Sequence, residues 1–217
     1  MIKKALLGII LLFAIIYTFS IGIKDSEYIM VFKLIPMILI ISYALLSKAL
    51  NVKKYYILMI IGLVVCAIGD YTIQHWFIIG LSSFLIGHIF YISAFITTNE
   101  QKSPKSLLAG LVVYGAVMAV IIAGGLFKDG DIVLGIAVIA YISVILTMGW
   151  TAWRTSSKYS IIGATLFIIS DTVLALNKFT IDIPYSNIWI MSTYYGAQIL
   201  LALSISQYSV IRNKVIQ

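Results

Sequence analysis

Long apolar stretches alternate with short polar connectors along the chain. Each apolar stretch is close to the roughly 20 residues that an α-helix needs to cross the hydrocarbon core of a bilayer. The pattern therefore predicts about eight membrane-spanning helices, over residues 5–23, 28–46, 55–73, 76–97, 107–127, 132–150, 160–177 and 187–208. Because the connectors leave no room for a separate soluble domain, we expect residues 1–217 to form a single integral membrane domain, an all-α polytopic transmembrane bundle.

The composition leads to the same class of protein. Of the 217 residues, 62% are hydrophobic and 11% are charged, whereas an ordinary soluble domain is about half apolar and about a quarter charged. A water-soluble globule could not cover such a chain with polar surface, and a disordered chain would need the reverse composition. Both of these classes are therefore excluded.

The basic residues are distributed unevenly over the connectors. The chain has 15 Lys and Arg against 8 Asp and Glu, a formal net charge of +7. Most of the basic residues fall on every second connector, beginning at the N-terminus: Lys3, Lys4, Lys48, Lys53, Lys54, Lys102, Lys105, Arg154, Lys158, Arg212 and Lys214. By the positive-inside rule, both termini are predicted to be cytoplasmic. The basic residues form no stripe and accompany no recognition motif, so no nucleic acid partner is expected. The compact size favours the bacterial cytoplasmic (inner) membrane.

Two segments, residues 60–70 and 161–171, match each other without gaps. Isoleucine matches are common in a chain so rich in isoleucine, but the Gly and Asp matches carry more weight because a carboxylate inside a span is rare. The identical pairs are Ile60/Ile161, Ile61/Ile162, Gly62/Gly163, Ile68/Ile169 and Asp70/Asp171. Both segments would cross the membrane in the same direction, which predicts two parallel four-helix halves that bring Asp70 and Asp171 towards one central cavity.

Three ionisable residues lie at a comparable depth in the outer half of the predicted spans: Lys33, Asp70 and Asp171. A buried unpaired charge is expensive, so these groups should face one another or a wet cavity rather than lipid. The alternatives are structural. Lys33 could snorkel to the outer interface, Asp70 could end its helix at the water boundary, and Asp171 could pair with a lysine.

Further polar candidates share helix faces with aromatic residues. His88 and Tyr91 lie on one stripe of the fourth span, where His88 could equally be a core histidine. Tyr194, Tyr195 and Gln198 lie close together on the eighth span, where an aromatic belt would explain the tyrosines better than the glutamine. On the seventh span, Lys178 shares a face with Asp171 and could lie above it near the outer mouth.

Several chemistries lack the residues that they need. With two histidines and Cys66 as the single cysteine, a zinc site is not expected, and no nucleophile-elbow, Walker or dinucleotide-binding signature is present. The sequence therefore predicts no metal and no cofactor. A pair of carboxylates in an apolar bundle is left, which suits general acid/base catalysis.

The polar motifs together resemble the YhhN-like integral membrane family, from about residue 33 to residue 198. The resemblance is weakest over the fifth and sixth spans, where only hydrophobicity matches. The matching motifs are Lys33-Leu-Ile-Pro36, Gly69-Asp70, Phe77-x-x-Gly80-x-x-x-Phe84-x-x-x-His88-x-x-Tyr91, Ser170-Asp171-x-x-Leu174-Ala175-x-Asn177-Lys178-Phe179, Pro184 and Thr193-Tyr194-Tyr195-Gly196-Ala197-Gln198.

The characterised members of that family are lysoplasmalogenases, so the resemblance implies a membrane hydrolase of lipid metabolism. Its substrate would be a lysophospholipid whose vinyl ether bond is cleaved to a fatty aldehyde and a glycerophospho-alcohol, without a cofactor, among membrane lipids. Asp70 and Asp171 would act as acid and base or stabiliser, in either order. Two other functions fit the residues alone, a small proton-coupled transporter and a non-catalytic lipid-binding protein.

The remaining motif residues would bind the substrate. Water and the glycerol hydroxyl would be ordered by Tyr194, Tyr195, Gln198 and His88, and the phosphate would be bound by Lys33 or Lys178 as a point charge. The motifs also make Tyr91 and Asn177 candidate substrate-binding residues.

Overall fold

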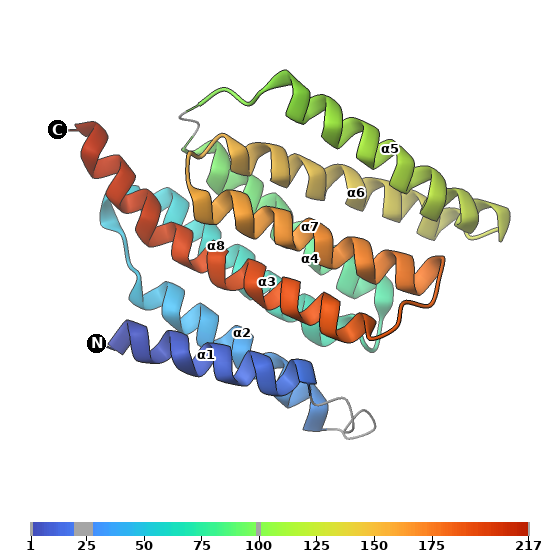
Figure 1. Ribbon diagram of the computed structural model, residues 1–217, viewed down its shortest axis with the longest axis horizontal. Coiled ribbons are helices and arrows are strands. Elements are labelled where there is room, and N and C mark those ends of the chain that lie inside the picture. The colour runs from blue at the N-terminus through green and yellow to red at the C-terminus, as the bar shows by residue number, and fades with distance from the viewer. Residues whose placement is uncertain (1, 20–27, 99–100, 217) are drawn as a thin grey trace.

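The computed structural model describes residues 2–19, 28–98 and 101–216, which contain eight α-helices and no strand (Figure 1). The predicted all-α bundle is therefore confirmed. The helices are α1 (Ile2–Phe19), α2 (Tyr28–Leu46), α3 (Lys53–Thr72), α4 (Phe77–Ile96), α5 (Lys105–Lys128), α6 (Ile132–Trp153), α7 (Lys158–Phe179) and α8 (Ser186–Ile216), and a short 3-10 helix, η2 (Leu50–Val52), precedes α3.

The multi-pass character of the chain is confirmed as well. Within the described ranges, seven helices are long and apolar enough to cross a membrane, and α2 adds a shorter apolar helix, Met30–Leu46. Figure 1 shows the N- and C-terminal ends at the same end of the bundle, as an even number of crossings requires. The cytoplasmic location of that end stays a prediction from the charges.

The helix bounds differ from the predicted ones mainly at α8. That helix runs to Ile216, beyond the predicted end at residue 208, although its last turns are polar. Asn51, in the connector before α3, explains the extension. Its Nδ2 donates to the main-chain oxygen of Ser209 at 2.9 Å and to Asn213 Oδ1 at 2.8 Å. The predicted end of the first span, residues 20–23, lies outside the described residues.

The helices contact one another in a pattern that repeats between the two halves of the chain. The most extensive contacts join α3 to α4 and α7 to α8, and α4 contacts α6 just as α8 contacts α2. The matched glycines serve the same purpose in each half. A Cβ on Gly62 would lie 2.4 Å from Tyr91 of α4, and one on Gly163 would lie 3.1 Å from Leu201 of α8. This packing agrees with two parallel four-helix halves.

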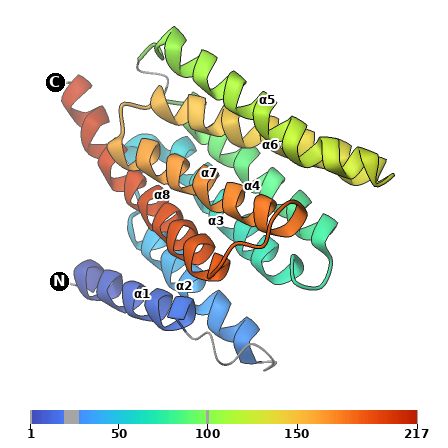
Figure 2. The same ribbon diagram turned by 45° about the vertical axis from the view of Figure 1, so that its right-hand side comes forward.

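The buried side chains form two separate clusters. The main core runs through α1 to α4 and α6 to α8, whereas the smaller cluster joins α5 to α6 through Met118, Ile122, Leu126 and Val138. In both views α5 lies at one edge of the bundle, opposite α1 (Figures 1 and 2). A cavity lies at the seam between the two clusters, with lining residues from both.

Candidate active site

A cavity of about 90 Å³ lies inside the membrane-spanning region, several times the space that one water needs. Residues from α2 to α8 line it, and most of them are apolar. Its ionisable residues are Lys33, Asp70 and Asp171, and Tyr114, Tyr141, Ser170, Thr172 and Tyr194 are its other polar residues. The predicted convergence of the three ionisable groups is therefore what the structure shows.

Asp70, near the C-terminal end of α3, is the centre of a buried polar group. Lys33 Nζ of α2 lies 3.2 Å from Asp70 Oδ1 and also donates to the main-chain oxygen of Asp70 at 3.2 Å. The Tyr194 hydroxyl of α8 donates to Asp70 Oδ2 at 2.5 Å. Lys33 and Asp70 are only 6% and 2% exposed, so Lys33 does not snorkel to the interface but serves as the counter-ion of a buried carboxylate.

The local structure of α2 helps to hold Lys33 in place. Pro36 lies inside this helix and cannot donate a main-chain hydrogen bond to the preceding turn. In that turn, the main-chain oxygen of Lys33 accepts a hydrogen bond from the Tyr195 hydroxyl at 2.8 Å. The oxygen that Pro36 leaves without its helical donor is that of Phe32, four residues earlier, so the bond from Tyr195 to Lys33 is an additional anchor of the same turn. Tyr195 therefore holds the main chain at Lys33, and its side chain does not line the cavity.

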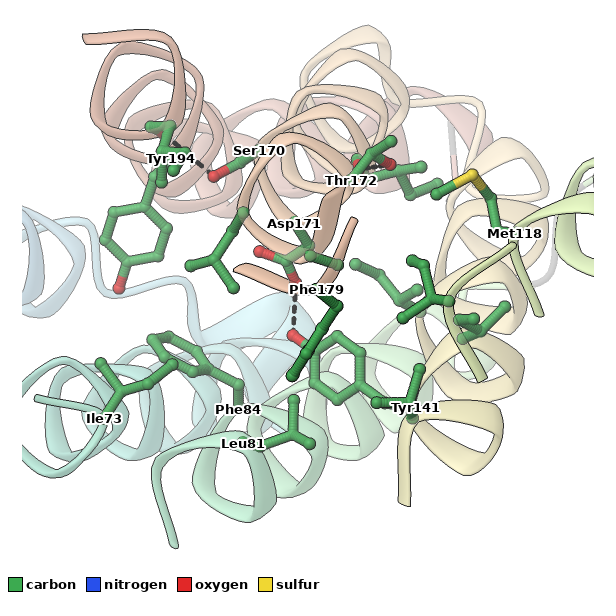
Figure 3. A pocket seen from close by; sticks show the side chains of 18 of the residues that line it. Ile73, Leu81, Phe84, Met118, Tyr141, Ser170, Asp171, Thr172, Phe179 and Tyr194 are labelled. Atoms are coloured by element: carbon green, nitrogen blue, oxygen red, sulfur yellow. Dashed lines mark hydrogen bonds between the residues drawn. The ribbon is translucent and has the colours of Figure 1, made fainter. Parts of the chain in front are cut away.

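Asp171, on α7, has different partners. The Tyr141 hydroxyl of α6 donates to Asp171 Oδ2, and Figure 3 shows Asp171 between Tyr141 and Tyr194. Among the described residues, the one ion pair is that of Lys33 with Asp70, so no cation is paired with Asp171. The neighbouring Thr172 shares a 2.5 Å hydrogen bond with the Tyr114 hydroxyl of α5. The two carboxyl groups thus line one cavity in unlike electrostatic environments.

A second polar layer lies behind the cavity. The Tyr91 hydroxyl donates to Gln198 Oε1 at 2.8 Å, and both residues are fully buried. His88 is fully buried as well, and its ring centroid lies 4.5 Å from that of Phe167 and 5.5 Å from that of Tyr141. Within the described part of the chain, neither ring nitrogen of His88 has a hydrogen-bond partner, and nor does Gln198 Nε2. These residues contact the lining residues rather than the cavity.

The cavity is aromatic where the start of α4 meets the end of α7. Phe77 of α4 and Phe179 of α7 both line it, with ring centroids 5.5 Å apart. The exposed Lys178 Nζ lies 4.4 Å from the centroid of the Phe77 ring. Asn177 holds the connector to α8, because its Oδ1 accepts a hydrogen bond from the main-chain nitrogen of Ile183 at 2.9 Å. Lys178 thus lies against a residue that lines the cavity, and Asn177 shapes the connector beside it. The place of Lys178 at an outer mouth stays a prediction.

Tyr141 and Tyr114 are two polar residues of the site that the sequence did not indicate. Both lie in stretches that resembled the family only in hydrophobicity. The Tyr141 hydroxyl bonds Asp171 itself, and the Tyr114 hydroxyl bonds the next residue, Thr172. A signal was present, since a tyrosine in the middle of a span needs a partner for its hydroxyl. That signal does not indicate which partner it will be.

Comparison with known proteins agrees with the resemblance found in the sequence. The YhhN family profile matches residues 28–205. The Homo sapiens protein named lysoplasmalogenase TMEM86A is 38% identical over 158 residues, which are 66% of this chain and 63% of the relative. Lysoplasmalogenase TMEM86B of Sus scrofa is 31% identical over 195 residues, 87% of this chain and 81% of the relative.

A bacterial protein is also similar. The Mycobacterium bovis protein named lysoplasmalogenase is 28% identical over 151 residues, 64% of this chain and 57% of the relative. The matches thus span less than two thirds of the human and the mycobacterial relatives. No solved structure matches the chain. Since the family profile covers most of the residues, including both carboxylates of the cavity, the chain belongs to the YhhN family.

Proposed function

We propose that this protein hydrolyses the vinyl ether bond of lysoplasmalogens inside the membrane. The observation that carries the proposal is the pair of carboxyl groups, Asp70 and Asp171, which line one cavity and have unlike partners. The names of the relatives support the substrate class. Paired carboxyls in different environments can divide the roles of acid and base between them.

The reaction needs an acid, a stabiliser of positive charge and a water. Protonation of the β-carbon of the vinyl ether gives an oxocarbenium ion, and water adds to the adjacent carbon with loss of a proton. The resulting hemiacetal breaks its bond to the glycerol oxygen, which takes up a proton, and leaves a fatty aldehyde and a glycerophospho-alcohol. Glycosidases use two carboxyl groups for an oxocarbenium-like transition state in a similar way.

In our proposal Asp171 supplies the first proton. Asp171 is only half-buried, but its carboxyl lies in a mostly apolar cavity without a cation, where the neutral form is less costly, and the hydrogen bond that it accepts comes from the neutral hydroxyl of Tyr141. Asp70, paired with Lys33, is suited to remain a carboxylate that stabilises the oxocarbenium ion and accepts the proton of the attacking water. Tyr194, which donates to Asp70, would orient that water.

The other predicted substrate-binding residues act through their neighbours in this proposal. Tyr195 positions Lys33, and His88 packs against Tyr141. Gln198, one helical turn after Tyr194 on α8, accepts a hydrogen bond from Tyr91 of α4. These are positioning residues, because the cavity is lined by other side chains.

The phosphate of the substrate would bind Lys178, since Lys33 is occupied by Asp70. For Lys178→Gln we expect KM for a lysoplasmalogen to rise about two- to fivefold, because an exposed charge contributes at most about 1 kcal/mol. The value of kcat should stay unchanged, and so should KM for an alkenylglycerol that has no phosphate. Steady-state kinetics with both substrates measure this.

The matched control is Lys128→Gln, which removes an exposed charge at the C-terminal end of α5 from a residue that does not line the cavity. It should change neither KM. An equal rise in KM for the two substrates in Lys178→Gln would contradict phosphate binding and indicate that Lys178 only supports Phe77.

The proposed function is tested by aldehyde release. Purified protein in mixed micelles receives a lysoplasmalogen or its saturated alkyl-ether analogue, and mass spectrometry measures the products. We expect fatty aldehyde from the vinyl ether and no reaction of the analogue, because a saturated ether has no carbon–carbon double bond that could be protonated at its β-carbon. Folded protein that releases no aldehyde would contradict the proposal, and substrate uptake driven by a pH gradient in proteoliposomes would then support the transporter alternative.

A further inference from the structure

The cavity is polar at one end only. Its ionisable residues come from α2, α3 and α7, whereas α5 contributes Met118 and Ile122 and, as its one polar group, the hydroxyl of Tyr114. That hydroxyl bonds Thr172, the residue after Asp171. The apolar part against α5 therefore begins directly beside a candidate catalytic carboxyl.

The helix α5 is attached to the bundle differently from the other helices. It packs on α6 and makes few contacts with α7. Its buried residues Met118 and Ile122 belong to the small cluster with Leu126 and Val138, separate from the main core. Three residues before Met118 on α5, Leu146 of α6 fills the space beside Gly115, where a Cβ would lie 2.6 Å from Leu146 Cδ1. The apolar part of the cavity thus has a floor at Leu146 and a wall at α5.

We propose that this apolar part binds the hydrocarbon chain of a single-chain ether lipid, and that Met118 and Ile122 determine which chain lengths fit. The inference rests on the proposed function and extends it to substrate selection. The occupant follows from continuity, since the hydrocarbon chain is covalently joined to the vinyl ether that Asp171 of α7 would protonate. Among the described residues, α5 contributes no charged side chain to the lining, as an alkenyl chain requires.

Selection by this site would depend on shape. The bilayer interior is as apolar as the cavity, so burial of the chain in the protein gives little net hydrophobic gain. A chain of the right length gains close packing, and a longer chain must bend or displace a side chain. Met118 can adapt because methionine is unbranched and flexible, whereas the β-branched Ile122 presents a stiffer surface.

The test is binding of saturated alkyl-ether lysolipids that differ only in chain length. They are not hydrolysed in the proposed reaction, so binding is measured apart from turnover, by displacement of a fluorescent lysolipid from the full-length protein in nanodiscs. We expect the tightest-binding length to move to shorter chains in Ile122→Trp and to longer chains in Ile122→Ala and Met118→Ala. Val120→Trp is the matched control because Val120 is on the same helix but 75% exposed, and its optimum should equal that of the wild type.

The outcomes separate this inference from the proposed function. An optimum that stays at the wild-type length in the alanine variants, or equal shifts in the Ile122 and Val120 variants, would overturn the chain site even if aldehyde is released. A shift in the expected directions without any aldehyde would support the chain site and contradict vinyl ether hydrolysis. Ile122 is only 2% exposed, so if Ile122→Trp does not fold, the two alanine variants decide.

Discussion

Asp171→Asn is expected to lower the rate of aldehyde release about 10²- to 10⁴-fold, the usual contribution of a general acid or base. The amide keeps the shape of the side chain and can still accept the hydrogen bond of Tyr141, so the bundle should remain folded. What the variant loses is the proton that the proposed mechanism delivers to the β-carbon. The measurement is kcat on a lysoplasmalogen, with thermal unfolding as the check on folding.

Asp70→Asn should lower kcat by a similar factor, because the amide removes the negative charge that faces the oxocarbenium ion. Tyr141→Phe should cost less than either, since the carboxyl of Asp171 remains. The matched control is Asp182→Asn, an exposed aspartate in the connector between α7 and α8, which should keep wild-type turnover. Wild-type turnover in Asp70→Asn or Asp171→Asn would remove that residue from the mechanism.

Lys33→Met is expected to cost about 3 kcal/mol of stability, because it leaves the buried carboxylate of Asp70 without a cation. Lys33 and Asp70 are both almost fully buried, and a water molecule in the cavity would bring no positive charge to replace the lost ammonium group. The double variant Lys33→Met with Asp70→Asn removes the charge as well and should recover much of that loss. Thermal unfolding in detergent measures both, and a lower unfolding temperature in the single variant than in the double variant is the expected result.

A double-mutant cycle makes this prediction falsifiable. Losses that add within about 0.5 kcal/mol would mean that Lys33 and Asp70 do not stabilise each other. Lys178→Met is the comparison for a lysine at the surface, and its effect on the unfolding temperature should be small because Lys178 is exposed.

The helices and their connectors could be predicted because a bilayer leaves few choices. An apolar stretch of about 20 residues must be a helix there, since each main-chain group needs an internal partner. The end of α8 could not be predicted, because its polar last turns are held by hydrogen bonds from Asn51, which is far away in the sequence. The rare ionisable residues Lys33, Asp70 and Asp171 were also predictable, because charges at membrane depth are costly and indicate a site.

Which side chains bond to each other within the site depends on how the helices pack. Tyr194 and Tyr195 are neighbours on α8, about 100° apart around the helix, and the sequence offers no reason to choose between them. In the bundle Tyr194 reaches Asp70 in the cavity, and Tyr195 reaches the main chain of α2. Likewise, Lys33 could have paired with either aspartate, and α2 lies against α3, so it pairs with Asp70.

Hydrophobic patterning and the cost of buried charge, which act on each residue separately, therefore account for the membrane bundle, the eight helices among the described residues and the three ionisable groups of the cavity. The choice of partners depends on which helix faces which. Tyr141 bonds Asp171 because α6 packs against α7, and Met118 and Ile122 line the cavity because α5 packs against α6. In a bilayer that orientation follows from close packing between helices rather than from burial of apolar surface, and close packing is a property of the assembled bundle.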